Sequence, residues 1–183
     1  MRQFLTLLTL LFLSLQCAVA QDTTITLDGE AFTEQFVIHP PSGNKHIEFV
    51  RKGETFKNWT KRVGFHYQQL PGVGNDPGKV GAGMAQIVKA YNASSQSRVI
   101  VNKQNSEALI DFLTWPPDAE FLEFNVFRYA RSADGKAVVS VQFSYRLTGS
   151  SALDIEQFRK IRASWIEQAE AFDINKVHAA LAH

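Results

Sequence analysis

Hydrophobic and polar residues alternate most regularly between Glu120 and Leu147. In the second half of this stretch one face is apolar, and only Val138 interrupts the polar face. A period of two is typical of a strand with one buried face. Asp134-Gly135 is a favoured two-residue turn in which both positions take positive φ. The pattern therefore predicts a β-hairpin with Phe143 opposite Val126, Tyr145 opposite Phe124, Leu147 opposite Leu122 and Arg146 opposite Glu123.

Shorter patterns before and after this hairpin predict further strands and helices. Asp76 before Pro77 marks a helix start, and Thr55 is a candidate N-cap for a single helical turn. If strands pair around the Pro-Gly turn at 40–44, Phe36 and Ile38 face the same way as Ile47 and Phe49. The predicted strands are Gln35–His39, Lys45–Arg51, Lys61–Gln69, Arg98–Lys103 and Glu107–Trp115, and the predicted helices are Glu54–Trp59, Pro77–Tyr91, Ala152–Phe172 and Asp173–Leu181.

Runs of strands with two well-separated main helices predict an α+β fold. We expect a mostly antiparallel, twisted sheet flanked by the two main helices, in an α/β/α sandwich. The order of elements also allows at least one parallel or crossover pairing near Pro77–Tyr91. The long C-terminal helix is expected to face the sheet with a stripe made of Phe158, Ile161, Trp165, Ala169 and Phe172.

The first twenty residues are typical of a cleaved signal peptide. Arg2 precedes the apolar run Phe4–Leu15, and Ala18-Val19-Ala20 is a small-residue cleavage site. The run is too short for a membrane span of about 20 residues. We therefore expect 1–20 to be removed, 21–183 to form a single domain, and the protein to be periplasmic or secreted, with no membrane span.

Composition narrows the classes of partner. The single cysteine, Cys17, lies in the leader, so the mature chain is expected to have neither a disulfide nor thiolate chemistry. Loss of the leader removes Arg2 and no acidic residue, so 19 Lys and Arg become 18, against 18 Asp and Glu. A net charge of zero argues against a nucleic-acid partner and against an anionic membrane surface.

Three short stretches and the order of elements carry a resemblance to known proteins. The stretches FVIHPPSG at 36–43, IEFV at 47–50 and GETFKNWT at 53–60 resemble a group of small exported bacterial proteins without assigned activity. The order of elements is similar to the Mog1/PsbP-like fold, a sheet with helices on both sides. Members of that fold act as accessory and assembly factors that bind other proteins, so the resemblance implies a binding role and supplies no catalytic residue.

Motifs for catalysis are missing from the sequence. The glycine-rich loop before Lys79 has Val73 and Val80 where a phosphate-binding loop needs Gly and a hydroxyl. There is no Gly-x-Ser-x-Gly elbow, and no pair of carboxylates is placed for acid–base work. We therefore expect no catalysis and no cofactor.

Histidines are the candidate metal ligands. His39 and His46 flank the same turn and, with His66 or Glu48, could form a zinc or copper corner. The alternative is that they are exposed histidines at a hairpin end.

Arg128 does not fit the apolar pattern of the hairpin. It shares a face with Val126 and Ala130 and lies opposite Val141 in the predicted register. A buried arginine needs a partner, so Arg128 either forms a structural ion pair or recognises an anion at a cleft.

Aromatic residues make up the candidate interaction surface. Phe121, Phe127 and Tyr129 point to the polar side of the hairpin. Either the Pro77–Tyr91 helix covers them, which we favour, or they form a patch that binds a partner together with Trp59 and the loop Leu70–Gly78. We expect an exported binding or accessory module whose partner is an envelope protein. Its interaction surface is expected to consist of Trp59, Phe127, Arg128 and Tyr129. The alternative is a small-ligand or metal-binding protein, or an enzyme, with a site at His39, His46 and His66 or at Arg128.

Overall fold

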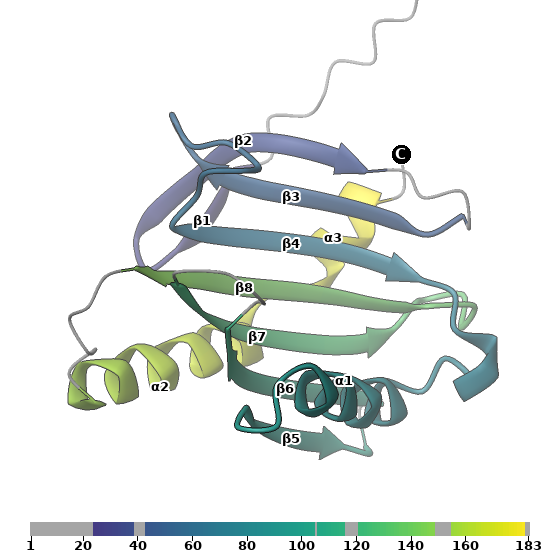
Figure 1. The fold of residues 1–183 in the computed structure, drawn as a ribbon. Coiled ribbons are helices and arrows are strands. Elements are labelled where there is room, and N and C mark those ends of the chain that lie inside the picture. The colour runs from purple at the N-terminus through teal and green to yellow at the C-terminus, as the bar shows by residue number, and fades with distance from the viewer. Residues whose placement is uncertain (1–23, 39–42, 105, 116–120, 149–154, 182–183) are drawn as a thin grey trace, which may run out of the picture.

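The computed structural model describes residues 24–38, 43–104, 106–115, 121–148 and 155–181 (Figure 1). In these ranges the strands form one antiparallel sheet in the order β1-β2-β3-β4-β8-β7-β6-β5. The α+β class and the antiparallel sheet are therefore confirmed. The elements are β1 (Ile25–Leu27), β2 (Glu30–Ile38), β3 (Lys45–Arg51), β4 (Lys61–Gln68), a short 3-10 turn (Pro71–Val73), α1 (Pro77–Tyr91), β5 (Gln96–Asn102), β6 (Glu107–Thr114), β7 (Phe121–Arg131), β8 (Val138–Thr148), α2 (Ile155–Ala171) and α3 (Ile174–Leu181).

The predicted hairpin forms β7 and β8 in the predicted register. Phe143 pairs with Val126, Tyr145 with Phe124, Leu147 with Leu122 and Arg146 with Glu123. The turn itself differs from the prediction. Only its glycine has positive φ, at 71°, and the backbone N–H of Ser132 donates to the carbonyl of Ala137, so the loop has four residues. The Asp134 carboxylate accepts from the Ser132 hydroxyl and from the backbone N–H of Lys136, which stabilises this wider loop without changing the register.

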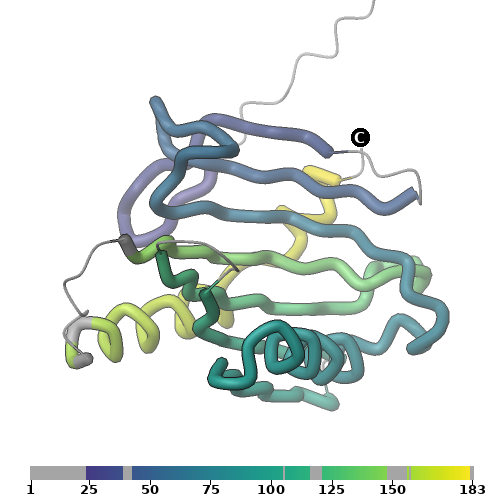
Figure 2. Tube along the Cα trace, in the orientation of Figure 1, coloured from purple at the N-terminus to yellow at the C-terminus, as the bar shows by residue number. Residues whose placement is uncertain are grey.

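In the sheet, β5 lies far from β4, the strand that precedes it in sequence. After β4 the chain passes through α1 and reaches β5 at the edge of the sheet, beyond β8, β7 and β6 (Figure 2). The expected crossover is thus present, and every neighbouring pair of strands that the structure describes is antiparallel.

Helices cover both faces of the sheet, as predicted (Figure 1). α1 packs on β5, β6 and β7 from one face, and α2 and α3 pack from the other. The buried cluster under α2 and α3 is the larger of the two and includes the fully buried Trp165 and Ala169. Phe158, Ile161 and Phe172 pack against it, so the predicted inward stripe is confirmed.

Two local predictions are wrong. Phe36 pairs with Glu48 and Ile38 with His46, so both share a face with those polar residues and not with Ile47 and Phe49. The stretch 54–59 contains turns and no helix, because the backbones of Thr55 and Asn58 bond to each other in both directions, which a helix does not allow.

Some predictions fall outside the described residues. They are the leader at 1–20, the turn at 40–42, His39, and the first residues of the long helix. In the part of the chain that is described, no helix combines the length and the apolar character that a membrane crossing needs.

Candidate functional site

The aromatic residues proposed for an interaction surface are buried. Trp59 is 4% exposed, Phe127 7% and Tyr129 1%. Phe127 and Tyr129 stack on each other and pack with Val80, Met84 and Val88 of α1. α1 therefore covers these aromatic residues, which is the alternative we favoured, and they do not form an open patch for a partner.

Trp59 holds the loop before β4 against the sheet. Its ring lies between the guanidinium groups of Arg62, at 4.4 Å, and Arg146, at 4.0 Å. Burial, together with the nearby charge of Arg62, lowers the pKa of Arg146, although Glu123 opposes this effect. Cation–π contacts with two guanidinium groups explain why Trp59 is buried beside charged groups. Its role is to anchor the loop.

Arg128 is bound to groups of the protein itself. It lies opposite Val141, as predicted. One terminal nitrogen, Nη1, donates to the carbonyls of Glu170, at 2.7 Å, and Phe172, at 2.8 Å, at the end of α2, and Nη2 binds Oε1 of Glu107 at 2.8 Å. These contacts satisfy carbonyls that a helix end leaves free. These contacts agree with the prediction of a structural ion pair. They do not support the alternative, in which Arg128 recognises an anion at a cleft.

Two of the candidate metal ligands, His46 and His66, stack on each other instead of converging. The rings of His46 and His66 are 4.1 Å apart at their centroids and inclined by 24°. Nε2 of His46 is 3.3 Å from Oε1 of Glu48, while Nε2 of His66 bonds to Oε1 of Gln142 at 3.0 Å. Among the described residues no group of three or more His, Cys, Asp and Glu is arranged to hold a metal. Parallel stacked rings do not aim their nitrogens at a common point, and the metal corner therefore has no geometric support.

His66 makes the stability of the fold depend on pH. Burial, with His46 as a smaller cause, lowers the pKa of His66 from 6.5 to about 3. Between these values the unfolded chain binds a proton that the folded chain does not, so the free energy of unfolding falls as the pH is lowered. We expect a loss of about 2 kcal/mol from pH 7 to pH 5 through this group. Urea unfolding of the wild type and of His66→Gln checks this, because the variant should lose less. Equal losses would contradict it.

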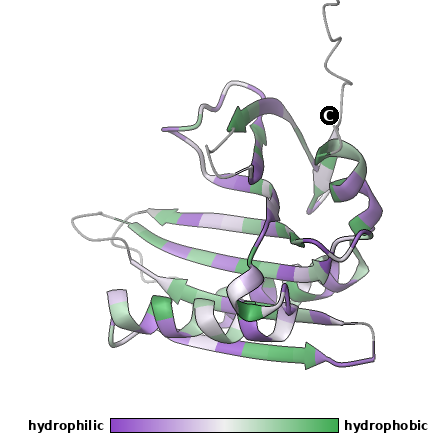
Figure 3. Ribbon diagram, turned by 90° about the vertical axis from the view of Figure 1, so that its right-hand side faces the viewer, coloured by the Kyte–Doolittle hydropathy of each residue, from purple (hydrophilic) through white to green (hydrophobic). Residues whose placement is uncertain are grey.

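One open edge of the sheet is the strand β5, here called the β5 edge (residues 96–102). It pairs only with β6 among the described residues. Ile100 is 40% exposed and Val101 47%, and they point to opposite faces. Figure 3 shows this bottom strand changing from hydrophilic to hydrophobic along its length. Edge strands are usually protected by charge, proline or shortness, yet the β5 edge has seven residues, no proline and one charge, Arg98.

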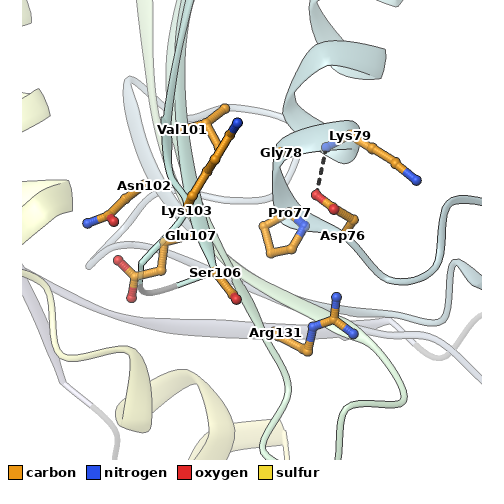
Figure 4. A pocket seen from close by; sticks show the side chains of 10 residues that line it. All are labelled: Asp76, Pro77, Gly78, Lys79, Val101, Asn102, Lys103, Ser106, Glu107 and Arg131. Carbon is orange, nitrogen blue, oxygen red and sulfur yellow. Dashed lines mark hydrogen bonds between the residues drawn. The ribbon is translucent and has the colours of Figure 1, made fainter.

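A basic cleft of about 460 Å³ lies beside the β5 edge on the α1 side (Figure 4). We call it the α1-side cleft. Its two acids are already engaged: Oδ1 of Asp76 accepts from the backbone N–H of Lys79, and Glu107 binds Arg128. Its cationic side chains, Lys79, Lys103 and Arg131, are exposed. The cleft therefore presents net positive charge next to Val101.

A second cleft, of about 590 Å³, lies on the other face between β5, β6 and α2. We call it the α2-side cleft. Its centre is Asp111, which is 2% exposed and accepts from Nε of Arg98 at 3.2 Å and Nε of Arg162 at 2.6 Å. Arg159 adds a third guanidinium. The apolar part of the lining is Leu113, Trp115, Phe124 and Phe158.

Sequence reasoning did not find the β5 edge or its two clefts. Which strand lies at an edge depends on pairings distant in sequence, and the pattern of Val99, Ile100 and Val101 resembles that of an interior strand. One signal was available. Asp111 interrupts the apolar run of β6, and a carboxylate in such a run needs a cationic partner nearby.

Three comparisons with known proteins were informative to different degrees. A family model matches residues 19–174, which is most of the chain. The search of curated proteins found no match, and neither did the search of solved structures.

Proposed function

Because the chain belongs to the uncharacterised family whose model spans residues 19–174, we propose its function from its geometry: it is an exported binding or accessory module that captures an extended segment of a partner protein on the β5 edge. The observation that carries this proposal is a full-length edge strand without the usual protection. A partner segment that adds a strand would pair its backbone with β5 and place alternate side chains on the two faces.

Exposed apolar residues on both faces support capture of a strand. Ile100 points to the α2 side and Val101 to the α1 side, so an added strand covers apolar surface whichever face its own apolar side chains take. Covering this surface would contribute about 25 cal/mol per Å² of apolar area.

Charge next to the β5 edge favours a different protein over a second copy of the same chain. Two copies pairing edge to edge would bring the basic residues of both chains, Arg98 and Lys103 among them, to one shared seam. Like charges across a strand pair are destabilising. An acidic partner segment would instead be attracted by both clefts.

Val101→Lys is expected to abolish capture of the partner, because a lysine on an edge strand opposes strand addition. The measurement is affinity capture from envelope extract with the mature chain as bait, compared by quantitative mass spectrometry. Val37→Lys is the matched control: Val37 is 49% exposed on the part of β2 that pairs only with β3 among the described residues, at the other side of the sheet, so the same chemical change is made on a second open edge at nearly the same exposure.

We expect the protein captured by the wild type and by Val37→Lys to be lost with Val101→Lys. Circular dichroism and urea unfolding establish that both variants are folded. If a folded Val101→Lys chain retains its partner, or if both variants lose it equally, the β5 edge is not the binding surface.

A further inference from the structure

The α2-side cleft combines positively charged and apolar side chains, and strand capture on the β5 edge does not account for this combination. Its lining includes three arginines, Arg98, Arg159 and Arg162, and four apolar side chains, Leu113, Trp115, Phe124 and Phe158. Asp111 is the acidic residue of the lining, so the charges of the lining sum to an excess of positive charge. Its volume of about 590 Å³ lies within the range of small-molecule sites, about 300–1,000 Å³.

The buried carboxylate of Asp111 fixes the guanidinium groups of Arg98 and Arg162. Asp111 is almost fully buried and binds the Nε atoms of Arg98 and Arg162, one on each carboxylate oxygen. This arrangement fixes both side chains through Nε and leaves their terminal nitrogens without a hydrogen bond to the residues that the structure describes. Arg98 is exposed, so its terminal nitrogens are accessible. A planar guanidinium held in this way is well suited to bind an anion with two parallel hydrogen bonds.

The third arginine is free to bind. Arg159 is exposed on α2 and makes no ion pair with any residue of the described ranges. The buried carboxylate of Asp111 is satisfied by the other two arginines, so the charge of Arg159 is left for a ligand. The positive charge of the cleft therefore favours an anionic ligand that binds the arginines.

The apolar lining defines the other half of the ligand. Trp115 is 40% exposed, although large aromatic side chains are usually covered. Phe158 is half-buried and contacts Phe124 at a ring distance of 5.2 Å, which gives the cleft a packed aromatic floor. An apolar chain or ring lying on this floor would cover Trp115.

We propose that the α2-side cleft is a binding site for a small amphipathic anion: a single carboxylate on an apolar body, in the size range of a medium-chain fatty acid. The carboxylate binds the terminal nitrogens of Arg159 and Arg98, and the apolar body lies along Trp115 and Phe158. This site borders the strand-capture surface, since Gln96, Ser97 and Arg98 of β5 line it, but Val101, the residue changed to test strand capture, points to the opposite face of the sheet.

The test uses decanoate as the probe, with decanol and acetate as matched ligands that lack the charge or the apolar body. Binding is measured by isothermal titration calorimetry and by tryptophan fluorescence on the mature protein. We expect decanoate to saturate one site and to change the fluorescence, and we expect both decanol and acetate to bind at least about tenfold more weakly.

Variants locate the site. Arg159→Gln should weaken decanoate binding by about tenfold. Lys160→Gln is the matched control, since Lys160 is the next cation on α2, is 77% exposed and does not line the cleft. Trp115→Phe should abolish the fluorescence change while calorimetry still detects binding, because the other two tryptophans, Trp59 and Trp165, are buried and do not line the cleft.

Three results would overturn the proposal: no saturable decanoate binding, equal affinity for decanol, or a fluorescence change that persists in Trp115→Phe. Equal weakening by Arg159→Gln and Lys160→Gln would also overturn it, as a general effect of net charge. Val101→Lys should leave decanoate affinity unchanged, so the outcome is independent of strand capture.

Discussion

Replacing Trp165 by alanine is expected to lower the free energy of unfolding by about 3–5 kcal/mol, the range for removal of a large buried aromatic side chain. Trp165 is fully buried and packs with Phe124, Phe143 and Tyr145 at ring distances of 5.8–6.1 Å. These partners belong to β7 and β8, the hairpin at the centre of the sheet. Trp165 is therefore the main contact between α2 and that hairpin.

The same indole also fixes the β1–β2 connection. Its Nε1–H donates to Oδ2 of Asp28 at 2.5 Å, and Gln168 donates to the other carboxylate oxygen at 2.7 Å. Burial raises the pKa of Asp28, but the hydrogen bonds from Gln168 and Trp165 and the charge of Lys61 outweigh it, and the pKa is lowered. Asp28 is thus ionised at neutral pH and binds β1 and β2 to α2.

Urea unfolding separates the two roles of Trp165. Trp165→Phe keeps most of the packing and removes the donor to Asp28, so we expect a smaller loss, about 1.5–3 kcal/mol, the range for a hydrogen bond to a charged group. Tyr91→Ala is the control, because Tyr91 is 78% exposed, and it should change stability by less than about 0.5 kcal/mol. A loss below about 1 kcal/mol in Trp165→Ala, which is roughly the effect of an average point mutation, would contradict this account of α2.

Arg128→Met should lower the free energy of unfolding by about 3 kcal/mol. Methionine retains an unbranched apolar stem but removes the donors that bind the last carbonyls of α2 and the carboxylate of Glu107. Both sets of acceptors would then be left without their partner in a half-buried place. The positive charge at the C-terminal end of α2 is lost as well, and a cation there stabilises a helix.

Two measurements check the role of Arg128. Urea unfolding gives the size of the loss, with Lys52→Met, an exposed cation near the end of β3, as a control expected to change stability by less than about 0.5 kcal/mol. Hydrogen exchange should show faster exchange in the last turn of α2 in Arg128→Met. If stability and exchange both match the wild type, Arg128 is not a structural residue, and its reading as an anion-binding arginine regains support.

Local sequence patterns predicted where the helices and strands lie better than they predicted which strands lie next to each other in the sheet. The β7–β8 register followed from alternation, since a shift of one residue would have exposed the whole apolar row. α1 followed from Asp76 and Pro77 at its start. The position of β5 at the edge did not follow, because it depends on β4 pairing with β8 across a long separation in sequence.

The prediction of an exposed aromatic surface was wrong for a related physical reason. Trp59, Phe127 and Tyr129 were considered for a surface because aromatic residues appeared on a polar face, and α1 and two arginines cover them. Arg128 was correctly identified as needing partners, but the carbonyls it binds come from α2, 42 residues away in sequence for Glu170. Alternation tells which face a residue takes; it does not tell what packs on that face.

Site-specific photocrosslinking tests strand capture on the β5 edge most directly. A benzophenone side chain is placed at position 101 and, in a second variant, at position 37, and the protein is irradiated in intact cells. We predict a discrete adduct with one partner protein from position 101 and none from position 37, because only the first lies on the β5 edge. Adducts from position 37 alone, equal adducts from both positions, or no adduct from position 101 would contradict the proposal.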